Sequence, residues 1–213
     1  MTAAAAAAAA PITEPSDEPD IGKLGMWVFL ASEVLFFGGL FLAYLYGRAH
    51  WPLGWAAASR HTDVVLGTVN TALLLTSSAV VALAVACEED DARHRGWTVR
   101  LLALTAALGT AFLIVKGFEW HAEWDEHLIP GPSFALEVPG AQEFFVLYFV
   151  MTGLHGVHMI AGIAVLAVLA GGRSRQREWA GARQIEVAAL YWHFVDIVWI
   201  FLYPLLYLVQ RHG

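Results

Sequence analysis

Five long apolar runs constrain this chain more than any other feature. They cover residues 24–47, 64–87, 98–118, 144–171 and 187–209. A bilayer core of about 30 Å needs about 20 apolar residues in a helix, so each run is long enough to cross it. The runs predict an all-α membrane protein, a bundle of five transmembrane helices. In the third run we expect the two basic residues, Arg100 and Lys116, to extend outward from its ends.

Composition supports the membrane assignment. Hydrophobic residues make up 58% of the chain and charged residues only 15%, which is too apolar for a soluble domain of 213 residues. The net charge of −7 argues against a nucleic-acid partner. The only cysteine, Cys87, excludes an internal disulfide and any metal cluster built from cysteines.

The first twenty residues differ from the rest. They hold an alanine tract, three prolines and four acidic residues, but no lysine or arginine. Such a segment is neither a secretory signal nor an Arg-rich transit peptide. We expect a disordered tail over 1–20, followed by a transmembrane domain over 21–213. A short frayed helix without function over the alanine tract fits equally well.

The basic residues predict an orientation. Cytoplasmic loops carry an excess of lysine and arginine. With the N-terminus in the cytoplasm, eight basic residues lie inside (Lys23, Arg93, Arg95, Arg100, Arg173, Arg175, Arg177 and Arg183) and four outside (Arg48, Arg60, Lys116 and Arg211). We therefore expect a cytoplasmic N-terminus and an outside C-terminus.

Glu33 is the most exceptional residue of the chain. It lies nine residues past Leu24, about 13 Å along a helix and close to the bilayer midplane. An ionisable group at that depth is costly and is a functional candidate by default. The acid there is either protonated or ionised against a close partner. The alternative to a functional role is a neutral acid that hydrogen-bonds two helices.

Other polar side chains fall inside the fourth, fifth and second runs. His155 and His158 are three residues apart, on one helical face, and could bind a metal or cross-link helices by hydrogen bonds. His193 and Asp196 also share a face, and the aspartate could orient the imidazole. No third ligand is evident, so we predict no metal site. Asn70 is typical of hydrogen bonding between membrane helices.

A dense group of charges follows the third run. Its acidic members could form a surface on which a partner's periplasmic domain docks, and a simply solvated charged face is the alternative. The acidic residues are Glu119, Glu123, Asp125 and Glu126.

Three segments, taken together, resemble one known family. They run from Ser32 to Phe41, from Thr152 to Gly162 and from Tyr191 to Phe201. These motifs are similar to those of subunit III of the haem-copper oxidases and occur in that family's order, over roughly residues 24 to 210.

The resemblance implies a cofactor-free subunit in a bacterial plasma membrane, packed against the catalytic subunit I and also subunit II. Haem and copper would lie in those partners, which reduce oxygen and pump protons. Glu33 would be the family's membrane-embedded glutamate, associated with proton uptake and the integrity of the catalytic centre. The long family form has seven helices around a cleft that holds lipid. This chain lacks the first two, so a phospholipid would bind with one wall of that cleft absent.

Alternatives remain open at this stage. The segment from Lys116 to Trp120 and the acidic loop after it favour a cytochrome c oxidase over a quinol oxidase or an accessory subunit of nitric-oxide reductase. From another class, the histidines could make the chain a haem b-binding enzyme. A proton-coupled transporter that uses Glu33 and Asp196 is a further hypothesis, although no internal repeat supports it.

Overall fold

The structure, a computed structural model, describes residues 21–90 and 95–208. The predicted disordered tail over 1–20 lies outside the described residues, as does the last residue of the fifth predicted run. Helices account for nearly all of the described chain, and no strand occurs in it. In chain order they are α1 (Ile21–His50), α2 (Pro52–Ser59), α3 (Val64–Asp90), α4 (Arg95–Asp125), α5 (Ala141–Ser174), α6 (Ala182–Tyr203) and the π-helical turn η2 (Pro204–Leu208).

Within these residues, five helices are long and apolar enough to cross a membrane, which confirms the predicted all-α class. Four of the long helices extend past the end of their apolar runs, whereas α6 begins before its run and ends within it, where η2 follows. For example, α4 continues from residue 118 to Asp125. Polar residues at the helix ends can be solvated at the membrane surface, so apolar character marks the membrane-buried centre of a helix better than its ends.

The short helix α2 was not predicted, because eight residues cannot produce a membrane signal. It begins at Pro52, whose fixed φ angle suits the first helical position. Trp55 from α2 is 1% exposed and packs edge-on against Tyr44 of α1 and Phe144 of α5. The helix therefore covers the apolar end of the bundle between α1 and α5.

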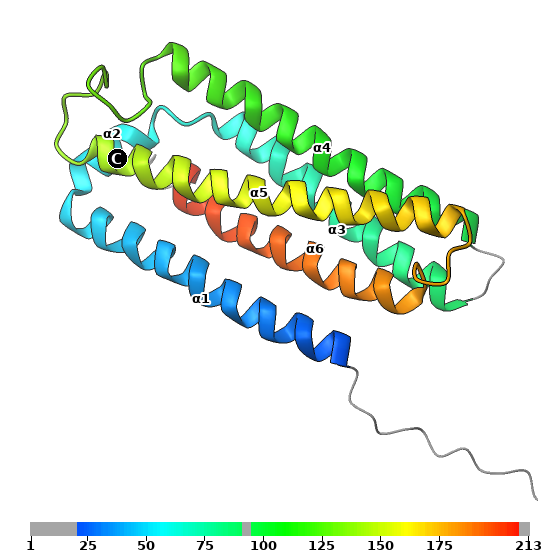
Figure 1. Cartoon of the computed structure of the whole chain (residues 1–213). Helices are drawn as coiled ribbons and strands as arrows, with labels where there is room; N and C mark the ends of the chain where they lie inside the picture. The colour runs from blue at the N-terminus through cyan, green and yellow to red at the C-terminus, as the bar shows by residue number, and fades with distance from the viewer. Residues whose placement is uncertain (1–20, 91–94, 209–213) are drawn as a thin grey trace, which may run out of the picture.

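Helices α3 to α6 pack together, and α1 lies along one side of them against α5 and α6 (Figure 1). Glycines allow the closest approach. A Cβ at Gly109 of α4 would lie 2.5 Å from the ring of Trp192, and one at Gly162 of α5 would lie 2.9 Å from it. Trp192 of α6 is thereby enclosed by two neighbouring helices, and its indole Nε1 donates to Ser77 Oγ of α3 at 3.0 Å.

Two ion pairs join helices at the end where the N-terminal helix begins. Lys23 of α1 contacts Glu186 of α6 at 2.7 Å, and both side chains are about 40% exposed. Arg173 of α5 bonds Glu88 of α3 through two nitrogens. These contacts fix α1 to α6 and α5 to α3 at the predicted cytoplasmic end. Arg100, at the same end of α4, is exposed as expected.

The orientation can be tested with two serines that lie at opposite ends of α5 and are both exposed, Ser133 before the helix and Ser174 at its end. In a Cys87→Ser background, we expect an impermeant thiol reagent on intact cells to label Ser133→Cys and not Ser174→Cys. After cell lysis both should react, which serves as the control for accessibility. Labelling of Ser174→Cys alone in intact cells would reverse the orientation.

Candidate functional site

Glu33 pairs with a histidine from another helix. Its Oε2 lies 3.1 Å from Nε2 of His158 in α5, and both side chains are 17% exposed. The sequence indicated that a carboxyl at this depth needs a partner, but it did not identify which residue provides it. The contact joins α1 to α5 and makes these two residues the centre of the candidate site.

The hydrogen bonds of His158 fix the number of protons in this pair. Its Nδ1 lies 2.8 Å from the carbonyl oxygen of Leu154, which can only accept a hydrogen bond, so Nδ1 carries a proton. The contact between Nε2 and Glu33 then requires one proton between the two atoms. The pair is either a carboxylic acid with a neutral imidazole or a carboxylate with an imidazolium, and it is neutral overall in both forms.

Aromatic side chains surround the pair. The ring of Phe37 meets His158 edge-on at 5.4 Å between centroids. Tyr191 of α6 donates to the carbonyl oxygen of His158 at 3.0 Å, which fixes the position of α5 against α6. Such apolar surroundings exclude water and strengthen the interaction between the two side chains.

The two histidines of α5 point to different neighbours. His158 faces α1, whereas His155 is 1% exposed and lies among rings, 5.5 Å from Phe112 and 5.2 Å from Trp199. Among the described residues, neither ring nitrogen of His155 has a hydrogen-bond partner, so the expected hydrogen-bonded cross-link is made by His158 and not by His155. In the described ranges, no three His, Cys, Asp or Glu side chains gather at one point.

The expected pairing of His193 with Asp196 is corrected by the structure. His193 Nδ1 lies 2.7 Å from Ser78 Oγ of α3. Asp196 is 2% exposed, and within the described residues its carboxyl oxygens make no hydrogen bond of normal geometry, although Ser78 also lies near it. The two side chains of α6 therefore lie on one side of the helix but approach Ser78 and not each other. Asn70 is fully buried, but its amide also lacks the expected hydrogen bond to a neighbouring helix.

The predicted acidic docking surface contains only two of its four residues. Glu119 and Glu123 are 3% and 4% exposed, so they lie inside the bundle. Asp125 and Glu126 remain on the surface, where they contact His121 at 3.1 Å and His61 at 3.8 Å. Tyr148 of α5 and Tyr207 of η2 bond Glu119. Tyr148 and Tyr207 come from other helices, so a local sequence pattern in α4 does not indicate that this end of α4 is buried.

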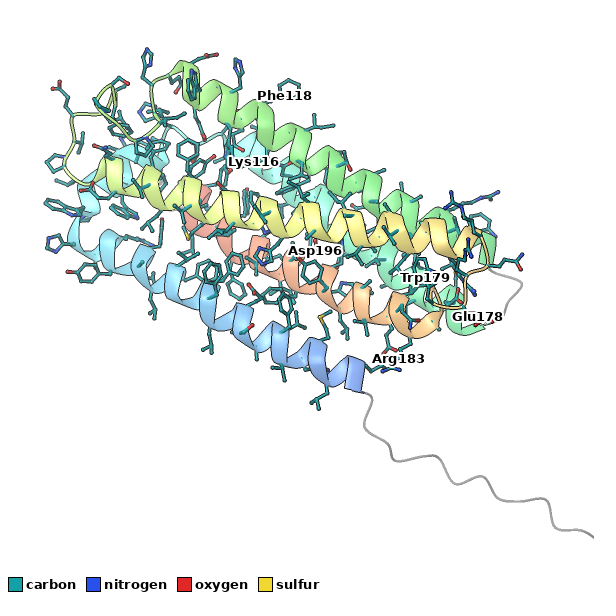
Figure 2. All side chains as sticks on the ribbon, viewed as in Figure 1. Lys116, Phe118, Glu178, Trp179, Arg183 and Asp196 are labelled. Atoms are coloured by element: carbon teal, nitrogen blue, oxygen red, sulfur yellow. The ribbon has the colours of Figure 1, made fainter. Side chains whose placement is uncertain are left out.

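Lys116 points inward, contrary to the expected outward extension, and its charge is fully paired (Figure 2). Its Nζ donates to Glu119 Oε2 at 3.0 Å and to the hydroxyls of Tyr148 and Tyr207, both at 2.6 Å. Both hydroxyls in turn donate to Glu119 Oε1, at 3.1 and 2.6 Å. All three ammonium hydrogens are used, and this network, called here the Lys116 network, joins α4, α5 and η2.

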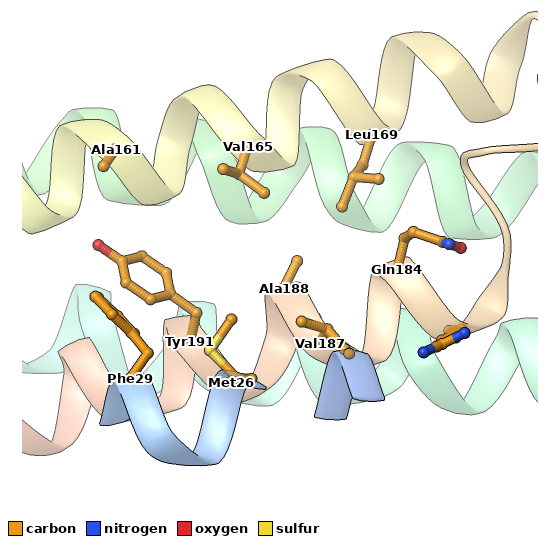
Figure 3. A pocket seen from close by; sticks show the side chains of 11 residues that line it. Met26, Phe29, Ala161, Val165, Leu169, Gln184, Val187, Ala188 and Tyr191 are labelled. Atoms are coloured by element: carbon orange, nitrogen blue, oxygen red, sulfur yellow. The ribbon is translucent and has the colours of Figure 1, made fainter. Parts of the chain in front are cut away.

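A groove of about 810 Å³ opens between α1, α5 and α6 (Figure 3). Its walls are mainly apolar, with Gln184 and Arg183 at one end. The apolar lining includes Met26, Phe29, Val165, Leu169 and Tyr191. The groove exists because α1 lies beside the other helices and is not enclosed by them, a feature that no sequence motif indicates.

Comparison with known proteins gives consistent matches. A family profile described as cytochrome c oxidase subunit III matches residues 20–210. The chain is 37% identical over 201 residues to cytochrome c oxidase subunit 3 of Thermostichus vulcanus, covering 92% of this chain and 90% of that protein. It is 33% identical to the Corynebacterium diphtheriae subunit 3, covering 91% of each. It is also 34% identical to the haem-copper oxidase subunit I+III of Aeropyrum pernix, covering 88% of this chain and 22% of that protein.

The Lys116 network makes a stability prediction. Lys116→Met leaves the buried Glu119 carboxylate without its cation, which should cost about 3–5 kcal/mol of folding free energy and lower the thermal midpoint of the chain in its purified assembly. Lys116→Met combined with Glu119→Gln should recover most of the loss, because no uncompensated charge remains.

Arg100→Met is the matched control, since Arg100 is an exposed base on the same helix that lies over the ring of Trp97. A thermal midpoint for Lys116→Met equal to that of Arg100→Met would show that the network does not stabilise the fold.

Proposed function

The chain belongs to the cytochrome c oxidase subunit III family, and we propose that within the oxidase it supports proton uptake by the catalytic subunit I through Glu33 and His158. The observation that carries this proposal is the contact of Glu33 with His158, whose other ring nitrogen faces the carbonyl oxygen of Leu154, so that one proton lies between the two side chains. The pair can pass its proton between two atoms without a change in net charge. That is a useful property in a medium where an isolated charge is costly.

The partners of the chain follow from the same family. The Aeropyrum pernix relative is named as subunit I+III, which joins the two subunits in one protein. This supports direct contact of our chain with subunit I, and we extend the proposal to subunit II. Haem and copper belong to these partners in the proposal. The family assignment replaces the hypotheses of a haem b enzyme and of a proton-coupled transporter.

The chain is a multi-pass membrane protein, and we place it in a bacterial plasma membrane with residues 21–213 as its membrane domain. The N-terminus lies in the cytoplasm in this proposal. Asp125 and Glu126, the two acidic residues that stay exposed, remain candidates for docking the outer domain of a partner. Docking through these exposed carboxylates would depend on salt.

We also propose that the groove between α1, α5 and α6 holds a phospholipid. Its walls offer aliphatic and aromatic contacts for an acyl chain, and the polar side chains of Gln184 and Arg183 lie at one end, where the headgroup would be placed. In the long family form, two further helices form one wall of the lipid cleft. The groove in this chain is at a different position, because its walls come entirely from α1, α5 and α6. A lipid there would fill the space that separates α1 from its neighbours.

Variants of Glu33 test the proton-uptake role. We expect Glu33→Ala to leave the oxidase assembled with near-normal initial turnover, because removal of a membrane-buried acid does not hinder helix insertion. Activity should then be lost several-fold faster during turnover, and proton pumping should be weaker. Glu33→Gln retains a hydrogen bond to His158 but cannot ionise, so it should resemble the alanine variant.

Glu186→Gln is the matched control, because it removes a carboxyl that links α1 to a neighbouring helix, in this case α6, at the exposed end of the helices. It should inactivate at the normal rate. Wild-type behaviour of Glu33→Gln together with failed assembly of Glu33→Ala would make Glu33 a packing residue and end the proposal.

The assignment of the redox centres to partner subunits has its own test. Once separated from the complex, the isolated chain should show no visible absorption and no stoichiometric metal, while the colour stays with the partner. A Soret band in pure, partner-free chain would contradict this assignment.

A further inference from the structure

The interior between α3, α5 and α6 contains buried polar groups without partners. The side-chain nitrogens and oxygens of Asn70, His155 and Asp196 make no hydrogen bond of normal geometry within the described residues, and these residues are 0%, 1% and 2% exposed. Ser78 approaches Asp196 but is already bonded to His193. Buried polar groups in proteins are almost always hydrogen-bonded, to protein or to ordered water. Three such residues from three helices therefore point to a bound ligand.

These three residues lie close to Trp199 of α6, either in contact with its ring or near it along their own helices. The ring of His155 lies 5.2 Å from it, and its indole Nε1 donates to Thr71 Oγ1 at 3.1 Å, next to Asn70 in the chain. Asp196 precedes Trp199 by three residues, so it lies on the same side of α6, one turn away. His155 thus touches the Trp199 ring, while Asn70 and Asp196 lie within one helical turn of residues at that level of the bundle.

The chemistry of the groups selects the ligand. The Asn70 amide offers two donor hydrogens and an acceptor oxygen, a neutral His155 offers one donor and one acceptor, and Asp196 offers acceptor oxygens. A metal cation would satisfy the acceptors and leave the N–H donors unpaired. Water both donates and accepts, and it commonly bridges buried polar groups of this kind.

The polar interior continues toward one end of the bundle. Lys116 Nζ lies 5.8 Å from the centroid of the Trp199 ring, and the Lys116 network follows. Glu123 lies on the same face of α4 as Lys116, near Lys116 and Tyr148, and is 4% exposed. In the part of the chain that the structure describes, its carboxyl oxygens make no hydrogen bond of normal geometry. Exposed Glu126 follows within one turn.

We propose that the α3–α6 bundle binds a chain of ordered water molecules that bridges Asp196, His155 and Asn70 and extends past Lys116 toward Glu123. The chain of water gives Asp196 a hydrogen-bonded route to the membrane surface at the Glu126 end. This inference does not depend on the role of Glu33, which lies in α1 on the other side of the bundle.

Radiolytic labelling of the intact oxidase in water enriched in ¹⁸O tests the proposal. Ionising radiation produces hydroxyl radicals from bound water, and these radicals oxidise the adjacent side chains. Trp199 is 1% exposed, so radicals from bulk solvent do not reach it directly. We expect Trp199 to be oxidised several-fold faster than Phe36, an aromatic residue on the outer apolar face of α1.

Variants locate the water. Asp196→Leu and Asn70→Leu remove groups that bind it and should each lower labelling of Trp199 at least twofold, whereas Asp196→Asn should retain it. Thr110→Val is the control, because Thr110 is exposed and bonds only its own helix, at Ala106. Labelling of Trp199 in the wild-type oxidase no greater than that of Phe36 would overturn the proposal, whether or not the leucine variants assemble. Unchanged labelling in assembled leucine variants would also overturn it.

Discussion

The hydrocarbon core of a membrane provides no hydrogen-bond partners, so each polar group in this chain must find one inside the protein. The Lys116 network meets this requirement completely, because every donor hydrogen of Lys116 and both oxygens of Glu119 are used. Hydroxyls within helices meet it locally, as where Thr105 bonds the carbonyl of Leu101 one turn back. Other polar groups find their hydrogen-bond partner only on a neighbouring helix, and these groups determine how the helices pack.

Two kinds of helix contact result. Helices α3 to α6 approach closely at glycines and enclose Trp192 and Trp199, and their interior is polar as well as aromatic. Helix α1 joins this bundle along one side, with the pair of Glu33 and His158 between its two ends. The proton between Glu33 and His158 therefore lies near the surface of the chain, close to where a neighbouring subunit can pack. The unpartnered groups near Trp199 lie deep inside the bundle.

Sequence reasoning identified the fold and the residues of interest but not their partners. The apolar runs predicted five membrane helices because hydrophobic length is a local property. The depth of Glu33 along its helix also follows from the local sequence, so this residue could be singled out. The choice of His158 over His155 as its partner depends on the rotation of α5 against α1, which is set by packing over the whole helix. The burial of Glu119 and Glu123 depends on Tyr148 and Tyr207, residues distant in the sequence.

The position of α1 has a consequence for how the chain is made. A polypeptide enters the membrane from its N-terminus, so α1 is synthesised before α5 and α6, its partners among the long helices. Until His158 emerges, Glu33 lacks the side chain with which it shares a proton and must wait in the bilayer as an uncharged acid or beside the insertion machinery. Docking of α1 is therefore completed only after α3 and α4 have been made, and the site formed by Glu33 and His158 forms only once α5 has been translated.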